Sequence, residues 1–184
     1  MKNRKPIPEI QAGSTADIAF LLLIFFLVST TFSKDKGIPR TLPQKCPTKE
    51  CATITKRRNI LTLQLNAEGA LLINEEKAVF SEVTTRIINF VDNNGNGQCT
   101  YCKGKKVDSL SESPKKAVLY LNAHPNSEYQ DYIKIQNAIS NAYLTLRQEM
   151  ALEVFGKKLE NLSKDEMNTV IKTYPLLLSE WQAP

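Results

Sequence analysis

Histidine and tryptophan are nearly absent from this sequence, which has one of each among its 184 residues. The single histidine, His124, directly precedes Pro125, and no serine, cysteine or paired acid suggests a hydrolytic partner for it. No glycine motif for phosphate binding occurs, so the chain is not expected to bind and hydrolyse a nucleotide by itself. The sequence therefore predicts a protein that is not an enzyme and carries no cofactor.

A concentrated basic surface is also missing. The formal net charge is +5, and the basic residues are dispersed in short groups. These groups lie at residues 2–5, 56–58, 103–106 and 157–158. No arginine-rich stripe alternates with aromatic residues, so nucleic acid is not an expected partner.

One long apolar run dominates the first part of the chain. Residues 18–28 are all apolar, and residues 12–32 are low in polarity. As a helix this segment spans roughly 30 Å, about the thickness of a bilayer's hydrocarbon core. Its one formal charge is Asp17, near its amino end. A carboxylate is costly to place inside a membrane, which favours a functional role for Asp17 over an interfacial position.

This segment resembles the membrane helix of the ExbD/TolR family, the small proton-channel subunits of bacterial energy-transducing motors. The resemblance rests on the basic tail, on Asp17 at the head of a Leu/Ile/Phe-rich run, and on Ser29, Thr30 and Thr31 at its end. It is specific over the tail and the helix and looser beyond them. It implies a single-pass protein of the bacterial inner membrane with a periplasmic α+β domain.

The predicted topology places the tail, residues 1–11, in the cytoplasm. Lys2, Arg4 and Lys5 favour this side, but basic residues also follow the helix, so charge alone does not decide. All four cysteines lie after the helix, and paired cysteines belong in an oxidising compartment. A cleaved signal peptide is the main alternative, and Asp17 and the lack of an Ala-x-Ala site argue against it.

Beyond the helix the sequence predicts a periplasmic linker, residues 33–58, and a folded domain, residues 59–184. Pro39, Pro43 and Pro47 indicate that the linker is extended. In the domain, alternating and helically spaced apolar residues predict the elements that follow. They are strands at 61–65, 70–73, 117–123 and 176–178, and helices after an N-cap at Ser81, at about 127–155, and after the capping-box pair Ser163 and Glu166.

This order predicts the α+β class, with a single N-terminal transmembrane helix followed by a small domain whose helices pack on one sheet face. Residues 147–174 are predicted to be a helical insertion between the long helix and the last strand. The sequence alone assigns this insertion no role.

The four cysteines form two pairs by spacing, Cys46 with Cys51 and Cys99 with Cys102. Structural disulfides are the favoured interpretation in an oxidising compartment, and four cysteines allow three pairings. A zinc site and a thioredoxin-like redox site are the alternatives. Residues 92–97 match the first half of a calcium loop, but Lys103 stands where the twelfth-position acid belongs, so no metal is expected.

The resemblance also implies a mechanism and partners. Asp17 would carry protons, and Ser29, Thr30 and Thr31 are candidates for lining the pathway. The chain would form a homodimer, in membrane lipid, inside a ring of multi-span ExbB/TolQ-type subunits and pass work to a TonB-type periplasmic protein. A TolR-type role in envelope integrity, a passive membrane anchor and a periplasmic redox or metal protein remain as alternatives.

Overall fold

The computed structural model describes residues 12–29 and 55–182, which belong to two separate units. The first unit contains helix α1 (Ala12–Ser29), all of whose residues are exposed in the isolated chain. Its 18 residues are long and apolar enough to be a single membrane span. The predicted apolar helix is therefore confirmed, and its last predicted residues, 30–32, lie outside the described part of the chain.

The second unit is built on a five-stranded sheet with the strand order β3-β2-β1-β4-β5. Its strands are β1 (Ile60–Leu65), β2 (Leu71–Ile73), β3 (Glu76–Ala78), β4 (Val118–Ala123) and β5 (Leu178–Gln182). The pairs β1–β2 and β2–β3 are antiparallel, whereas β1–β4 and β4–β5 are parallel. A short 3-10 turn, η2 (Arg57–Asn59), leads into β1.

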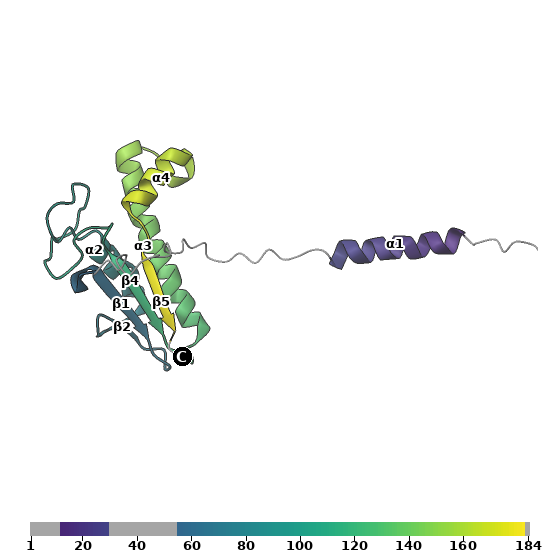
Figure 1. Ribbon diagram of the computed structural model, residues 1–184, viewed down its shortest axis with the longest axis horizontal. Coiled ribbons are helices and arrows are strands. Elements are labelled where there is room, and N and C mark those ends of the chain that lie inside the picture. Colours follow the sequence, from purple (N-terminus) through teal and green to yellow (C-terminus); the bar gives the residue numbers. More distant parts are fainter. Residues whose placement is uncertain (1–11, 30–54, 183–184) are drawn as a thin grey trace, which may run out of the picture. The chain divides into compact units, whose positions relative to one another are not determined.

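Two helices, α2 (Phe80–Val91) and α3 (Tyr129–Phe155), cover one face of this sheet (Figure 1). Every second residue of β1 and β4 is buried beneath them, because successive side chains of a strand point to opposite faces. Val83 and Ile87 of α2 and Ile139 of α3 complete this apolar core. The predicted α+β architecture, with helices on one sheet face, is confirmed.

Three local predictions differ from the structure. Strand β3 was not expected, because Glu76 and Lys77 give it no apolar alternation. Helix α2 begins at Phe80, and Val79, which provides no side-chain cap, takes the N-cap position predicted for Ser81. The last strand lies at Leu178–Gln182 instead of 176–178, because the chain needs residues 175–177 to leave the preceding helix and reach the sheet.

Beyond the sheet, α3 continues into the helical insertion, residues 147–174. Gly156 ends α3 in the left-handed conformation (φ 63°), and η3 (Leu159–Asn161) and α4 (Lys164–Thr173) follow. The predicted capping box between Ser163 and Glu166 is present. Helix α4 folds back beside the end of α3 (Figure 1), and Ala151, Leu159 and Val170 form a second, small apolar core there.

Candidate functional site

Asp17 is the one charged residue of α1. Phe20, Leu21 and Ile24 follow it at the spacings that share a helix face, so the carboxylate heads an apolar ridge. No basic residue of α1 is available to pair with it. A counter-charge or proton donor for Asp17 inside a membrane would therefore come from outside α1.

The hydroxyl groups predicted to line a pathway lie at the other end of this helix. Ser29 ends α1, and its Oγ donates a hydrogen bond to the carbonyl of Phe26 at 3.2 Å. Ser29 is roughly 18 Å along the axis from Asp17, given the helical rise per residue. Thr30 and Thr31 lie outside the described residues. The structure thus places Asp17 and Ser29 on one helix without bringing them together.

The two edges of the sheet are unequal. Strand β3 has three residues, and its Glu76 pairs with Arg86 of α2 at 3.3 Å. Strand β5 has five residues and pairs through β4 alone within the sheet. Glu180 of β5 accepts hydrogen bonds from the Tyr132 hydroxyl (3.2 Å) and from Gln136 Nε2 of α3. The longer edge is therefore held on its helix side, and no strand of the described residues pairs with its outer side.

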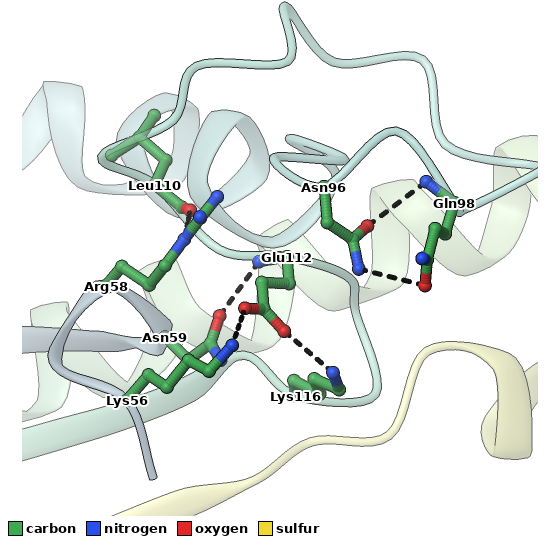
Figure 2. Close-up of polar contacts among 8 residues, drawn as sticks. All are labelled: Lys56, Arg58, Asn59, Asn96, Gln98, Leu110, Glu112 and Lys116. Carbon is green, nitrogen blue, oxygen red and sulfur yellow. Dashed lines mark hydrogen bonds and ion pairs between the residues drawn. The ribbon is translucent and has the colours of Figure 1, made fainter.

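The start of the domain is fixed by a buried carboxylate, Glu112, whose side chain is 4% exposed (Figure 2). Its two oxygens accept from Lys116 Nζ and Lys56 Nζ, each at 2.7 Å. These two lysines, Lys116 first, lower the pKa of Glu112 to about 2. Contacts of the folded domain thus include Lys56, which falls within the predicted linker, residues 33–58.

Two further bonds join this start to the loop between α2 and β4, residues 92–117, called the 92–117 loop below. Asn59 Oδ1 accepts from the backbone N–H of Glu112 at 2.8 Å, and Arg58 Nε donates to the carbonyl of Leu110 at 3.1 Å (Figure 2). Arg58 Nη2 lies directly over Gly95, where a Cβ would overlap it. The loop and the first turn of the domain therefore form one unit.

Buried asparagines give the 92–117 loop its shape. Asn93 Nδ2 donates to the carbonyls of Val107 (2.8 Å) and Ser111 (3.0 Å), and its Oδ1 accepts from Val107 N–H at 2.8 Å. Asn94 Nδ2 likewise donates to the carbonyl of Cys99, and its Oδ1 accepts from Cys99 N–H. The stretch that matches the first half of a calcium loop uses its asparagine side chains for these internal bonds. No group of His, Cys, Asp or Glu able to hold a metal occurs among the residues that the structure describes.

Of the four cysteines, the structure joins Cys99 to Cys102 in a disulfide, with Cα atoms 5.5 Å apart. Cys46 and Cys51 lie outside the described residues.

The 92–117 loop and the helical insertion meet at Tyr174, directly after α4. The Tyr174 hydroxyl donates to Asp92 Oδ1 at 2.8 Å, and Lys103 N–H donates to Asp92 Oδ2 at 2.9 Å. Burial raises the pKa of Asp92 despite these bonds, and burial and the nearby Asp92 raise the pKa of Tyr174. Arg147 of α3 donates to the Tyr174 carbonyl from Nε (3.1 Å) and Nη2 (2.8 Å). Three separate segments are therefore fixed at one point.

The structure thus combines a helix long and apolar enough for one membrane span, bearing one acid, with a small α+β domain. Residues 3–151 match the family model described as Biopolymer transport protein ExbD/TolR. This match covers more than half of the chain, and the protein belongs to the ExbD/TolR family. The comparison with curated proteins finds no match.

Family membership defines the general role. Members are anchored in the inner membrane and are non-enzymatic transport or stator subunits, working with ExbB/TolQ-type and TonB/TolA-type partners. The protein is therefore a membrane subunit of biopolymer transport or of a related envelope process. The match ends at residue 151, so η3, α4 and β5 lie beyond it.

Neither the Glu112 cluster nor the Asp92–Tyr174 contact could be anticipated from sequence patterns. Glu112 lies 56 residues from Lys56, and Asp92 lies 82 residues from Tyr174. Only the asparagine-rich stretch at residues 92–97 carried a signal, since asparagine side chains commonly bond nearby backbone in turns.

Proposed function

We propose that this protein is the proton-channel or stator subunit of an inner-membrane motor that uses the proton-motive force to energise TonB-dependent outer-membrane transport. The observation that carries the proposal is Asp17, the one charge on an otherwise apolar candidate membrane helix. Intramembrane acids of this kind typically serve in proton relays.

In this mechanism the side chain of Asp17 lies at the interface between α1 and the helices of a larger partner. A proton from the periplasm neutralises the carboxylate, and the neutral form moves past an apolar wall that the charged form does not cross. The proton is then released to the cytoplasm. Each proton supplies about 2.3 kcal/mol per 100 mV of membrane potential. Ser29, with Thr30 and Thr31, would bind water or partner helices on the periplasmic side.

The proposed topology follows from this pathway. Residues 1–11 form the cytoplasmic tail, residues 12–32 the membrane segment, residues 33–58 the periplasmic linker, and residues 59–184 the periplasmic domain. A homodimer of the chain sits in membrane lipid inside a ring of ExbB/TolQ-type subunits. One carboxylate on one helix does not make a closed proton path, so the ring provides the remaining groups.

Uptake of an iron complex by cells carrying Asp17→Asn tests the proton-carrier role. Asparagine keeps the size and most hydrogen bonding of Asp17 but carries no proton, so uptake should stop while the partners still co-purify. Asp17→Glu is the matched control and should retain part of the activity. Normal uptake with Asp17→Asn would exclude this role and favour a passive anchor. Intact iron uptake together with a leaky envelope when the protein is removed would favour the TolR-type branch.

The domain is proposed to receive its TonB-type partner by strand addition at β5. An edge strand presents N–H and C=O groups that recruit an extended peptide. β5 is the longer edge, whereas β3 is short and charged. Hydrogen exchange of the full chain in nanodiscs, with partner-derived peptides added, should show new protection along β5. Protection confined to helix surfaces would rule out strand addition.

A further inference from the structure

The Cys99–Cys102 disulfide closes only a short turn within the 92–117 loop. The rest of the loop is held without it: Asp92 and Asn93 carbonyls accept from the N–H groups of Gly104 and Lys106, each at 2.9 Å. Asn93 adds three side-chain bonds to the far side of the loop. Crosslinking so few residues also removes little freedom from the unfolded chain, since this stabilisation grows with loop length. The disulfide is therefore not what shapes the loop.

The disulfide instead fixes Tyr101, which lies between the two cysteines and contacts the helical insertion. The Tyr101 hydroxyl donates to the carbonyl of Thr173, the last residue of α4, at 3.4 Å. Its ring packs edge-on against Tyr174, with the centroids 5.7 Å apart. The turn closed by the disulfide thus contacts the point where the chain leaves α4 and runs to β5.

Cys99 is accessible from a hollow on the surface. This hollow has a volume of about 250 Å³ and is lined by Cys99, Gln98, Ser113, Lys115 and Lys116. Both cysteines are half-buried, and Asn94 holds the Cys99 backbone through its N–H (2.9 Å) and its carbonyl (2.8 Å). Lysine ammonium groups near a disulfide stabilise an incoming thiolate. The site combines a Cys99 backbone held by Asn94, an approach path and the ammonium group of Lys115, whereas Lys116 is paired with Glu112.

We propose that Cys99–Cys102 is a thiol–disulfide exchange site for a dithiol oxidoreductase. A thiolate of that protein attacks Cys99 Sγ, a mixed disulfide forms, and the Cys99–Cys102 bond breaks to release the Cys102 thiolate, which takes a proton. The second thiol of the oxidoreductase then attacks the mixed disulfide, releases Cys99 as a thiol and closes its own disulfide. Two electrons and two protons pass to this chain. This inference does not depend on the proposed proton pathway.

Reduction has a structural output. Without the crosslink, Thr100 and Tyr101 are no longer held in their turn, and the Tyr101 contacts with Thr173 and Tyr174 loosen. The segment from α4 to β5 then gains freedom, while β1 and β4 keep their apolar packing. The single tryptophan of the sequence, Trp181, lies on β5 and reports this change directly.

The test uses the full chain with Cys46→Ser and Cys51→Ser, in detergent micelles under native conditions. The probe is a thioredoxin whose second active-site cysteine is replaced by serine, which traps mixed disulfides. We expect a covalent adduct that peptide mapping places on Cys99. Lys115→Gln should slow its formation by about twofold or more, because the other lysine of the hollow, Lys116, is already paired with Glu112. Lys158→Gln changes an exposed lysine that does not line the hollow, and it should leave the rate unchanged. An adduct on Cys102, or none before unfolding, would overturn the proposal.

A second measurement tests the structural consequence of reduction. Free dithiothreitol should reduce the disulfide in the folded chain, change Trp181 fluorescence and raise hydrogen exchange over residues 99–102 and 164–182, with β1 and β4 unaffected. Replacing both cysteines, with Cys99→Ser and Cys102→Ser, should reproduce the reduced state without dithiothreitol. Reduction that leaves residues 164–182 unchanged, or that unfolds the whole domain, would show a purely structural disulfide.

Discussion

Two regions of the folded domain are stabilised by different interactions. One is the sheet with helices α2 and α3, called the sheet half below, and the other is the 92–117 loop, called the loop half. In the sheet half, Leu63 of β1, Leu121 of β4 and Ile87 of α2 are at most 1% exposed and belong to the apolar core. In the loop half most of the buried side chains are polar. Among the buried polar residues of the described chain, the loop contributes Asp92, Asn93, Asn94, Ser111 and Glu112.

This difference determines how each half responds to change. Apolar burial is non-directional, so a core tolerates substitutions that keep volume and loses stability in proportion to the volume removed. A buried hydrogen bond is directional, and removing one partner leaves the other desolvated and unsatisfied. The sheet half should therefore depend on volume, and the loop half on individual side chains.

The largest effect is expected in the core. Leu63→Ala removes a fully buried side chain and should lower the free energy of unfolding by about 2–5 kcal/mol, through lost burial and the cavity left behind. Chemical denaturation of the purified protein measures this. Leu144→Ala, the same change at a 57% exposed position of α3, is the control and should cost little. Equal losses in the two variants would contradict the assignment of the core.

Asn93→Ala comes next. It leaves the carbonyls of Val107 and Ser111 without their donor and should cost about 1–3 kcal/mol. Hydrogen exchange should increase at residues 104–112 and remain slow in β1 and β4. Asn96→Ala, in the same loop but bonded only to Gln98, should have little effect. A uniform rise in exchange over the whole domain would show that loop and sheet are one cooperative unit.

Ser163→Ala removes the side chain that caps α4 by accepting from Glu166 N–H at 3.3 Å. Loss of a serine N-cap costs about 1 kcal/mol. The cost should remain local, as faster hydrogen exchange in α4. Ser140→Ala, in the middle of α3, is the control, because its hydroxyl only bonds back to the Gln136 carbonyl. Slow exchange in α4 of the capping variant would mean that packing on α3 alone holds this helix.

Glu112→Gln should have the smallest effect at neutral pH, because its partners Lys56 and Lys116 are 68% and 56% exposed and solvent screens both pairs. Its pH dependence is more specific. The lowered pKa means that the folded chain binds this proton more weakly than the unfolded chain, so the carboxylate stabilises the fold above its usual pKa of 4.5. That contribution disappears as the pH falls toward about 2.

Thermal unfolding between pH 7 and pH 2 measures this contribution. The stability of the wild type should converge on that of Glu112→Gln at low pH, whereas Glu160→Gln, an exposed residue of η3, should follow the wild type throughout. A constant difference between wild type and Glu112→Gln at every pH would show that size, not charge, matters at this position.

The sheet and its covering helices were predicted well from the sequence. Burial on one face gives β1 alternating leucines and gives α3 apolar residues at helical spacing, and β4 is recognisable as a strongly apolar strand. Strand β3 carried no such repeat. Its turn, Asn74 and Glu75, has positive φ at both residues (49° and 71°), a conformation that Asn-Gly usually signals. Because Glu75 stands where glycine usually follows asparagine in such a turn, the sequence did not indicate the hairpin.

The loop half could not be predicted in the same way. Contacts such as Lys56 with Glu112 pair single side chains across long sequence separations, and no repeat along the chain encodes them. The resemblance identified the family through Asp17 and the residues after it, because that signal is local. The proton-carrying role of Asp17 and the pathway role of Ser29, Thr30 and Thr31 stay predictions.

The central position of β1 has a mechanical consequence. The chain comes into the sheet through β1, which lies between antiparallel β2 and parallel β4. A force directed along the axis of β1 would run perpendicular to the hydrogen bonds on both of its sides. Such a load would be shared in shear by the two ladders, and neither would be peeled open one bond at a time. A tether attached to an edge strand would lack this resistance, so this strand order suits a domain pulled by its own leading segment.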